Sequence, residues 1–400
     1  SPKRSSVYLM TGPRAGFFNP LGKRPMKQLK KTDVAIVGGG ILGLAFALEA
    51  IRQQKKVTVF ERNPRARGAS VRNFGMIYPL GMRPGKIFER ALRTRNLWLE
   101  LGQSAKFWLN PCGSLLVARS KEEIVVLEEF VSSRKDIEGL RLLTPKEALK
   151  KSPGLVQEGL LGALWSESEI CVDPQEAIQK ISLWLENCGV NFKNSTTVTA
   201  VESDQLIANG ERWYAKQIII CSGSDLQTLF PNEFRNSGVV NCQLQMFRTK
   251  AQPCSWLLGP MLASGLSLLH YPAFTALKSY QRLKDRLTKE HPKLLELGIH
   301  VLVSQHGHGK ITVGDSHEYG DSPAIFYQKE IEDLIRNYLS SFLTLPDAEV
   351  SERWLGNYVS HPSGEPWIYK PTDGVMLVNG IGGVGMTTGF GLAQEVLPEC

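Results

Sequence analysis

A glycine-rich turn directly after a short apolar strand constrains the fold of this chain more than any other feature. Residues 34–37 form an apolar, β-branched run, and Gly38-x-Gly40-x-x-Gly43 interrupts it before a helical pattern begins. The first glycine permits a tight turn, the second lets backbone approach a pyrophosphate, and the third lets the helix pack closely on the strand. The N-terminus of such a helix favours an anion, because its N–H groups and its dipole point there.

A second strand and an acidic residue complete this βαβ unit. The helical pattern spans residues 41–54, the next apolar strand spans 57–60, and Glu61 follows it. Glu61 lies about 20 residues past the middle glycine, the position of a carboxylate that accepts hydrogen bonds from ribose hydroxyls. A secretory signal is the alternative interpretation of the apolar run 34–50, but the glycines disfavour it. The unit therefore predicts dinucleotide binding.

The excess positive charge is confined to the N-terminal residues. The formal net charge is +8, and eight of the 47 Lys and Arg lie within residues 1–31 without an acidic residue. The number of other basic residues, 39, equals the number of acidic residues, 39, so the rest of the chain is formally neutral. Because nucleic-acid binding favours a basic stripe on a folded domain, we expect no nucleic-acid partner. We expect residues 1–25 to be a disordered or artificially added leader rather than a functional basic arm or transit peptide.

The cysteines and the apolar runs bear on the cellular compartment. Seven cysteines are scattered along the chain without a C-x-x-C pair. Such an odd and unpatterned number favours reduced thiols over a disulfide framework. Once the glycine turn is recognised, no apolar run reaches the ~18 residues of a membrane span. These features predict a cytoplasmic protein without a membrane span.

The remainder of the 400-residue chain indicates two interleaved domains. Helical and strand patterns alternate up to residue 237, with further strands of the first sheet expected within 190–204 and 217–225. Residues 238–353 then change to short alternating strands with one helix near 328–342, which predicts an antiparallel sheet. Residues 374–397 return to strand, glycine turn and helix. We expect a nucleotide-binding domain at 26–100, 155–237 and 354–400, and a substrate-binding domain at 101–154 and 238–353.

Three further segments favour a flavin dinucleotide over NAD. The loop 68–76 follows the ribose strand, where a flavin protein needs backbone and short hydroxyls beyond the pyrophosphate. Residues 220–223 end a late strand in small side chains, which lets a cofactor pass close to the backbone. The turn at 380–387 places a helix N-terminus whose dipole can stabilise the negative charge of a reduced flavin.

Several motifs carry a family resemblance. IVGGGILGLAFA, GASVRNFGM, VTAVE, IIICSG and GIGGVGMTTGFGLA occur in the order seen in FAD-dependent amine oxidoreductases of the D-amino-acid oxidase family, which includes glycine oxidase and sarcosine oxidase. The resemblance covers residues 32–397. It implies an α/β (α+β) fold, in which a Rossmann-like FAD-binding domain is interleaved with an antiparallel β-sheet substrate domain.

The resemblance also implies a cofactor and its binding residues. The cofactor is FAD, expected to be non-covalent, because Cys400 lies at the extreme end and no histidine closely follows the first glycine motif. Val198 would contact adenine through its backbone. The expected FAD-binding residues are Gly38, Gly40, Gly43, Glu61, Arg62, Ser70, Arg72, Asn73, Gly75, Met76, Val198, Ser222, Gly223, Gly383, Gly385, Met386 and Thr387.

The implied reaction is oxidation of the C–N bond of a small amine or amino acid, with hydride transfer to flavin N5 and hydrolysis of the imine. The terminal acceptor is oxygen or an electron carrier. RNFGM, HYPAF and GDSHEYG most resemble a branch often found beside phosphonate-degradation genes, which implies an aminophosphonate or N-alkyl amine as substrate.

The candidate catalytic residues are Tyr358, His270 and Arg72. Glycine-oxidase-like enzymes place a carboxylate-binding arginine soon after a W-x-G strand, whereas this chain has Tyr358 there. A tyrosine hydroxyl donates one hydrogen bond and does not replace the bidentate guanidinium. Anion binding then falls to Arg72, Arg83 or Lys278, or to His270 and His317. Each has a structural alternative: Arg83 and Lys278 as surface charges, Arg72 as a clamp on its loop or on FAD, and His270 as a core histidine in an aromatic strand.

Other candidates have simpler explanations. His306-x-His308 resembles a metal-binding pair, but it lies in a glycine hairpin without a third ligand at useful spacing, so we expect a turn and no metal. Trp354, Tyr358 and Trp367 are candidates for an aromatic wall, and sheet packing is the alternative. Two other functions remain open from the residues: a flavoprotein of RNA modification, and a non-catalytic dinucleotide-binding subunit.

Overall fold

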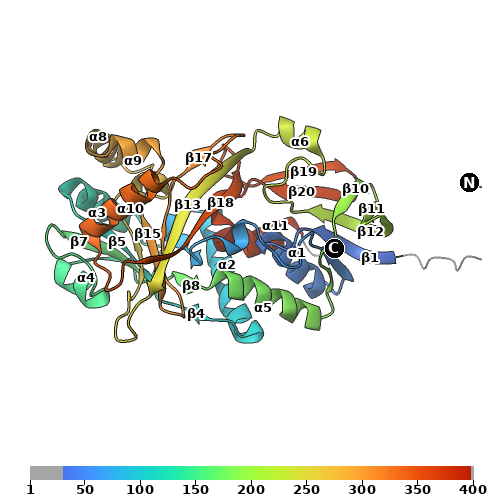
Figure 1. Cartoon of the computed structure of the whole chain (residues 1–400), viewed down its shortest axis with the longest axis horizontal. Helices are drawn as coiled ribbons and strands as arrows, with labels where there is room; N and C mark the ends of the chain where they lie inside the picture. Colours follow the sequence, from blue (N-terminus) through green and yellow to red (C-terminus); the bar gives the residue numbers. More distant parts are fainter. Residues whose placement is uncertain (1–29, 398–400) are drawn as a thin grey trace, which may run out of the picture.

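The computed structural model describes residues 30–397, so the expected leader at 1–25 lies outside the described residues. Figure 1 shows an elongated arrangement with one large sheet and its helices at each end. The chain passes between the two ends several times, so each sheet is built from segments that are far apart in sequence.

The first sheet is built on the predicted βαβ unit. β1 (Lys30–Val37) and β2 (Val57–Phe60) run parallel, and α1 (Ile41–Arg52) connects them. The strand order is β10-β11-β12-β1-β2-β9, with β20 beside β12 and β19 beside β20. The other strands are β9 (Asn191–Lys193), β10 (Val198–Glu202), β11 (Gln205–Ala208), β12 (Glu211–Ile220), β19 (Trp367–Thr372) and β20 (Val375–Asn379).

Helices bury one face of this sheet. Val34, Ile36, Val57 and Val59 alternate along β1 and β2 and share one apolar core with the inner faces of four helices. Because apolar side chains of parallel strands need cover on both faces, a second core on the opposite face contains Ala35 and residues of β10–β12. The four helices are α1, α2 (Lys86–Ala105), α5 (Pro174–Asn187) and α11 (Gly385–Val396).

The second sheet is mainly antiparallel and forms the other end of the molecule. Its order is β17-β13-β16-β15-β14-β5-β7-β6, with β18 on the other side of β13. Its strands are β5 (Ser114–Ala118), β6 (Arg141–Leu143), β7 (Gly162–Ser166), β13 (Val240–Ala251), β14 (Met261–Ala263), β15 (Leu302–Gln305), β16 (Lys310–Gly314), β17 (Glu318–Tyr319) and β18 (Val350–Ser360). A small third sheet joins β3 (Met76–Ile77), β8 (Ile170–Val172) and β4 (Leu109–Asn110).

Several helices belong to or border the second sheet. Capping boxes begin two of them, at Ser120 and Thr144, where the side chain of each cap and a glutamate three residues later satisfy each other's backbone N–H groups. These helices are α3 (Lys121–Ser133), α4 (Pro145–Lys151), α7 (Ser267–His270), α8 (Tyr280–Glu290), α9 (Pro292–Glu296) and α10 (Lys329–Phe342). α6 (Pro231–Asn236) instead packs Phe234 against Trp367 of the first sheet. Three short 3-10 turns are η1 (Ala69–Val71), η2 (Pro79–Gly81) and η3 (Gly382–Val384).

The structure confirms the βαβ unit and the final strand–turn–helix, but it corrects the expectation for 238–353. That segment contains α7, α8 and α9 besides the expected helix, and β13 is 12 residues long rather than short. The periodic signal of α8 is sparse because only Leu283 and Leu287 are buried. His270 ends α7 and therefore does not lie in a strand.

The expected domain limits stay a proposal. Two strands that these limits place in the nucleotide-binding domain, wholly or in part, pair with strands of the second sheet. β7 lies within 155–237 but pairs with β5 and β6, and most of β18 pairs with β13 although the limit was set at residue 354. Pairing between strands far apart in sequence decides which sheet each strand joins, and the local sequence pattern does not show that pairing. Among the described residues, no helix is both long and apolar enough to cross a membrane.

Candidate active site

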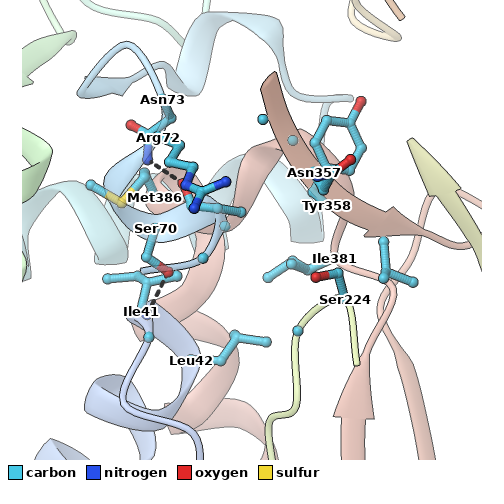
Figure 2. Close-up of a pocket in the computed structure, with 18 of the residues that line it drawn as sticks. Ile41, Leu42, Ser70, Arg72, Asn73, Ser224, Asn357, Tyr358, Ile381 and Met386 are labelled. Carbon is cyan, nitrogen blue, oxygen red and sulfur yellow. Dashed lines mark hydrogen bonds between the residues drawn. The ribbon is translucent and has the colours of Figure 1, made fainter. Parts of the chain in front are cut away.

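A deep cavity is lined by both large sheets. It begins at the β1–α1 turn and the end of β2, passes the loop around η1 and the start of α11, and ends beside α7 and β18. Figure 2 shows Ser70 above Ile41 at the start of α1, with Asn357 and Tyr358 on a strand across the cavity.

Close backbone contacts explain the glycines of the β1–α1 turn. Gly38 has a φ of +106°, and a Cβ there would lie 2.3 Å from the carbonyl oxygen of Cys221. A Cβ on Gly43 would lie 1.9 Å from the carbonyl oxygen of Gly38. Both distances are too short for carbon and oxygen, so side chains are excluded from the turn. A Cβ on Gly40 would lie 2.9 Å from Ser70 Oγ, at the cavity wall.

The N-terminus of α1 opens into the cavity. Gly40 has no side chain to cap the helix, and the N–H of Ile41 donates to Ser70 Oγ at 2.9 Å (Figure 2). The dipole and first-turn N–H groups of a helix favour an anion at this position. The arrangement is typical of a phosphate site.

Glu61 closes the nucleotide end of the cavity. Its buried carboxylate accepts hydrogen bonds from the N–H of Gly39 at 2.9 Å, the N–H of Asn63 at 2.9 Å and Asn63 Nδ2 at 3.0 Å. Arg62 also lines the cavity and forms an ion pair of 2.8 Å with Asp225. Val198, at the start of β10, lines the same end.

The loop around η1 crosses from the first sheet to the second. Arg72 Nη1 donates to the carbonyl oxygen of Leu355 at 3.3 Å, and Trp354 Nε1 donates to the carbonyl oxygen of Arg72 at 3.2 Å. Asn73 Oδ1 accepts from the N–H of Gly75 at 2.8 Å. Gly75 lies outside the cavity lining, and a Cβ there would lie 1.9 Å from the carbonyl oxygen of Val172. Its glycine is explained by this contact within the fold.

The N-terminus of α11 faces the cavity from the other side. Gly383, Gly385 and Met386 line it, and no side-chain cap begins the helix. Thr387 is buried, and its Oγ1 accepts a hydrogen bond from the N–H of Tyr78 at 3.0 Å. Ser222, after β12, has a buried hydroxyl without a hydrogen-bond partner among the described residues.

Tyr358 and three histidines occupy the far end of the cavity. The side chain of His270 is accessible from the cavity and lies deep within the protein. His300 and His317 lie beside His270. Burial lowers the pKa of His270, and neighbouring His317 lowers it further. Burial also lowers the pKa of His317 to about 4 and raises that of Tyr358 well above its ordinary value. The uncharged forms of these side chains are therefore favoured.

Sequence reasoning missed two cavity residues next to these histidines. His300 precedes β15, Asp315 follows β16, and they exchange backbone hydrogen bonds of 3.3 and 3.4 Å. The nearest sequence signal was GDSHEYG, in which Asp315 lies two residues before the candidate His317, but nothing local indicated that His300 would join them.

The comparison with protein families identifies the chain. The model of the DAO family, described as FAD dependent oxidoreductase, matches residues 33–397. This chain belongs to the DAO family of FAD-dependent oxidoreductases.

Glycine oxidase from Geobacillus kaustophilus is 27% identical over 205 residues, covering 48% of this chain and 54% of that protein. FAD-dependent oxidoreductase domain-containing protein 1 from Bos taurus is 30% identical over 221 residues, covering 51% and 45%. The aligned segments thus span about half the length of these curated relatives.

Solved structures share the fold over nearly the whole chain. L-proline dehydrogenase from P. horikoshii superposes with a TM-score of 0.73 at 17% identity, covering 92% of each chain. Glycine oxidase from Geobacillus kaustophilus also gives a TM-score of 0.73, at 19% identity, covering 92% of this chain and 94% of that one. At these identities the likeness shows the fold.

The residues lining the cavity fit the FAD of this family. Two helix N-termini face the cavity, the glycine turn leaves the space that a Cβ would fill, and the buried Ser222 hydroxyl lacks a partner among the described residues. Among the expected FAD-binding residues, Gly75 alone lies outside the cavity lining. Cys221 lines the cavity, and burial raises the pKa of its thiol, which disfavours a reactive thiolate. Non-covalent attachment stays a prediction, since Cys400 lies outside the described residues.

The structure removes other candidates from the site. Arg83 lies outside the cavity lining and 3.9 Å from Glu365, and the N–H of Lys278 donates to Glu129 on the helical surface. Trp354 and Trp367 do not line the cavity, because Trp354 packs under Arg248 and Trp367 packs against Phe234 and Tyr369. Of the expected aromatic wall, only Tyr358 lines the cavity.

His306 and His308 lie at the expected hairpin. Residues 307–308 form the turn between β15 and β16, and one nitrogen of each histidine lies 3.4 Å from Asp173 Oδ2. Asp173 was not expected near them. It also caps α5, since its Oδ1 accepts hydrogen bonds from the N–H groups of Gln175 and Glu176.

Proposed function

We propose that this protein oxidises the C–N bond of a small amine or amino acid, with FAD as the electron acceptor. One observation carries the proposal: the cavity continues from the nucleotide-binding turn to an enclosed end lined by Tyr358, Tyr271 and the histidines. A cavity that continues past the nucleotide site leaves room for a substrate beside the cofactor. Glycine oxidase and L-proline dehydrogenase, which share the fold, act by name on amino acids.

We assign the cofactor-binding roles by position. Glu61 would accept hydrogen bonds from the ribose, the N-terminus of α1 would bind the pyrophosphate, and the N-terminus of α11 would stabilise negative charge on the flavin. Bound FAD would supply the acceptor for the hydride of the carbon that bears nitrogen. Tyr358, Tyr271 and Leu302 enclose the far end, exclude water and orient the substrate.

The substrate class is narrowed by the charges of the cavity. Tyr358 stands where the glycine-oxidase pattern has an arginine, so the usual carboxylate clamp is replaced by a single hydroxyl. Arg72 is the candidate for binding an anionic group of the substrate, although its hydrogen bond to the carbonyl oxygen of Leu355 also serves its loop. An aminophosphonate or an N-alkyl amine is the proposed substrate.

Anaerobic reduction of the bound flavin tests this proposal. The purified FAD-bound protein is mixed with α-amino acids, N-methyl amines and aminophosphonates, and its visible absorbance is followed. Glycerol 3-phosphate and 2-hydroxy acids, which carry a hydroxyl in place of the amine, are the matched controls. We expect an amine class to bleach the flavin and the hydroxyl compounds to leave it oxidised, with return of the colour in air marking oxygen as acceptor. Bleaching by the hydroxyl compounds alone, or by no compound, contradicts the proposal.

A further inference from the structure

Four titratable side chains meet at the enclosed end of the cavity. His270 ends α7, His300 precedes β15, and Asp315 and His317 follow β16. The ring centres of His270 and His300 are 3.7 Å apart, those of His270 and His317 are 4.7 Å apart, and those of His300 and His317 are 5.1 Å apart. We call these four residues the His–Asp cluster.

Hydrogen bonds orient two of the imidazoles toward the carboxyl. His317 Nδ1 lies 2.8 Å from the carbonyl oxygen of Gly298, which can only accept, so Nδ1 carries the proton and Nε2 carries the lone pair. His300 Nδ1 lies 3.3 Å from Ser267 Oγ. The Nε2 atoms of His300 and His317 then lie 3.3 and 4.0 Å from the two carboxyl oxygens of Asp315.

Two buried polar atoms of this cluster remain without a hydrogen-bond partner among the described residues. They are Asp315 Oδ1 and His300 Nε2. The two atoms lie 3.3 Å apart but not in hydrogen-bond geometry. Buried polar atoms in native proteins are nearly always satisfied, so a polar ligand group that enters from the cavity would satisfy this pair. The two atoms therefore mark a polar subsite in an otherwise enclosed compartment.

The ring geometry disfavours a metal ion as that ligand. One nitrogen from each histidine lies within 4.8 Å of the others, a spacing that a metal site can have. However, the rings of His270 and His300 stack with only 18° between their planes. A lone pair lies in the plane of its ring, so stacked rings direct their lone pairs side by side and not toward one ion.

Charge favours a cationic ligand group instead. Of the described residues that line the cavity, only Glu61, Asp225 and Asp315 carry a carboxyl. Glu61 is bound by the glycine turn, and Asp225 is paired with Arg62 at the nucleotide end. Asp315 is thus the carboxyl that remains for a substrate at the enclosed end.

We propose that Asp315 binds the ammonium group of the substrate and accepts its proton, with His300 and His317 as positioning residues. This inference rests on the proposed function, because it assigns the residue that prepares an amine for oxidation. Asp315 acts here in its ionised form: an N–H bond of the ammonium breaks, its electron pair stays on nitrogen, and an O–H bond forms on the carboxylate of Asp315. The ligand class is a small primary or secondary amine, which becomes neutral inside the cavity.

The surroundings of Asp315 favour this direction of transfer. Burial raises the pKa of Asp315 well above its ordinary value, and burial together with His270 and His317 lowers the pKa of His300. A neutral amine beside a protonated carboxyl is then favoured over a buried ion pair. The titratable groups that face Asp315 are Cys242, Tyr271, His300, His317 and Tyr319, and both His270 and Tyr358 lie beside His317. None of these carries a fixed charge.

Flavin bleaching as a function of pH tests the transfer in the FAD-bound enzyme. Asp315→Asn is compared with Asp333→Asn, which changes a half-exposed carboxyl of α10 that pairs with Lys329. We expect Asp315→Asn to slow bleaching at saturating amine roughly 100-fold near pH 7, and to regain most of the rate near pH 10, where free amines lose their proton. Asp333→Asn should follow the wild type. An Asp315→Asn profile that coincides with the wild type overturns the inference.

A binding measurement separates this inference from the proposed function. 2-Aminoisobutyrate and tert-butylamine have no hydrogen on the carbon bearing nitrogen, so they cannot be oxidised there. We expect calorimetry to show that wild type binds one of them and that Asp315→Asn binds it about tenfold more weakly, with unchanged FAD content. If no amine bleaches the wild type but this loss occurs, the proposed function fails while the amine subsite stands. Equal binding by both proteins, or no binding by wild type, overturns the subsite.

Two histidine variants keep the test decisive if Asp315→Asn does not retain FAD. His300→Leu removes the nitrogen next to Asp315, and His300→Gln places an amide near the same position. We expect His300→Leu to move the half-maximal bleaching rate to higher pH and His300→Gln to restore part of the shift. Identical pH profiles for these variants and the wild type overturn the positioning role.

Discussion

Glu61 shows how one buried carboxylate organises the nucleotide end of the cavity. Its oxygens accept hydrogen bonds from Gly39 and Asn63, so the group is held in place within the protein itself. We expect Glu61→Gln to weaken FAD binding about 10- to 100-fold, because a charge-assisted hydrogen bond contributes about 1.5–3 kcal/mol. Fluorescence titration of the apoprotein with FAD measures this loss. Glu100→Gln, on the exposed side of α2, should retain wild-type affinity, and equal affinity of the two variants would argue against Glu61.

At the scale of elements, α11 packs against both α1 and α2 through glycines. These glycines differ in how much free space a Cβ atom would have. A Cβ on Gly391 would lie 2.5 Å from the carbonyl oxygen of Arg90, whereas a Cβ on Gly389 would lie 3.5 Å from Ile41 Cγ1. We expect Gly391→Ala to lower the free energy of unfolding by about 1–3 kcal/mol, since the helices must separate. Gly389→Ala should leave it unchanged or raise it by up to about 1 kcal/mol, because alanine favours helix. Urea unfolding of the FAD-bound protein distinguishes them, and equal losses would contradict this account.

At the scale of the whole molecule, Asp173 joins the two halves. It caps α5 beside the first sheet and bonds His306 in the β15–β16 hairpin of the second. Burial acts to raise the pKa of Asp173, but hydrogen bonds from His306 and from the N–H of Glu176 outweigh it and hold the pKa well below its ordinary value. A depressed pKa stabilises the folded state above the unfolded pKa of about 3.9, and this contribution is lost as pH falls below it.

We therefore expect the unfolding free energy of wild type to fall more steeply than that of Asp173→Asn between about pH 5 and about pH 3. Asparagine also caps a helix, so wild type and Asp173→Asn both keep the N-cap of α5. The variant loses only the negative charge next to His306. Urea unfolding at a series of pH values gives both slopes. Equal slopes would show that Asp173 contributes no acid-sensitive link between the halves.

The nucleotide end of the site was predictable because its geometry depends on contacts between residues that are close in sequence. The glycines at 38 and 43 are required by contacts inside one βαβ unit, and Glu61 follows from the length of that unit. The family resemblance assigned Gly75 to FAD, but a Cβ at Gly75 would contact the carbonyl oxygen of Val172, nearly a hundred residues away in the chain. α8 was not expected because it contains few apolar residues, and two leucines are its only buried side chains.

The sequence by itself determined the βαβ unit and the flavin-type glycine turns, because these depend on local backbone demands and on the period of apolar residues. The sequence offered Tyr358, His270 and His317 for the substrate end, but only the tertiary structure added His300 and Asp315 to them. His270, His300 and Asp315 come from a short helix, a strand start and a strand end, and they meet through the pairing of β14, β15 and β16. A one-residue change of that register would turn alternate side chains to the opposite face, so no local pattern could bring these groups together.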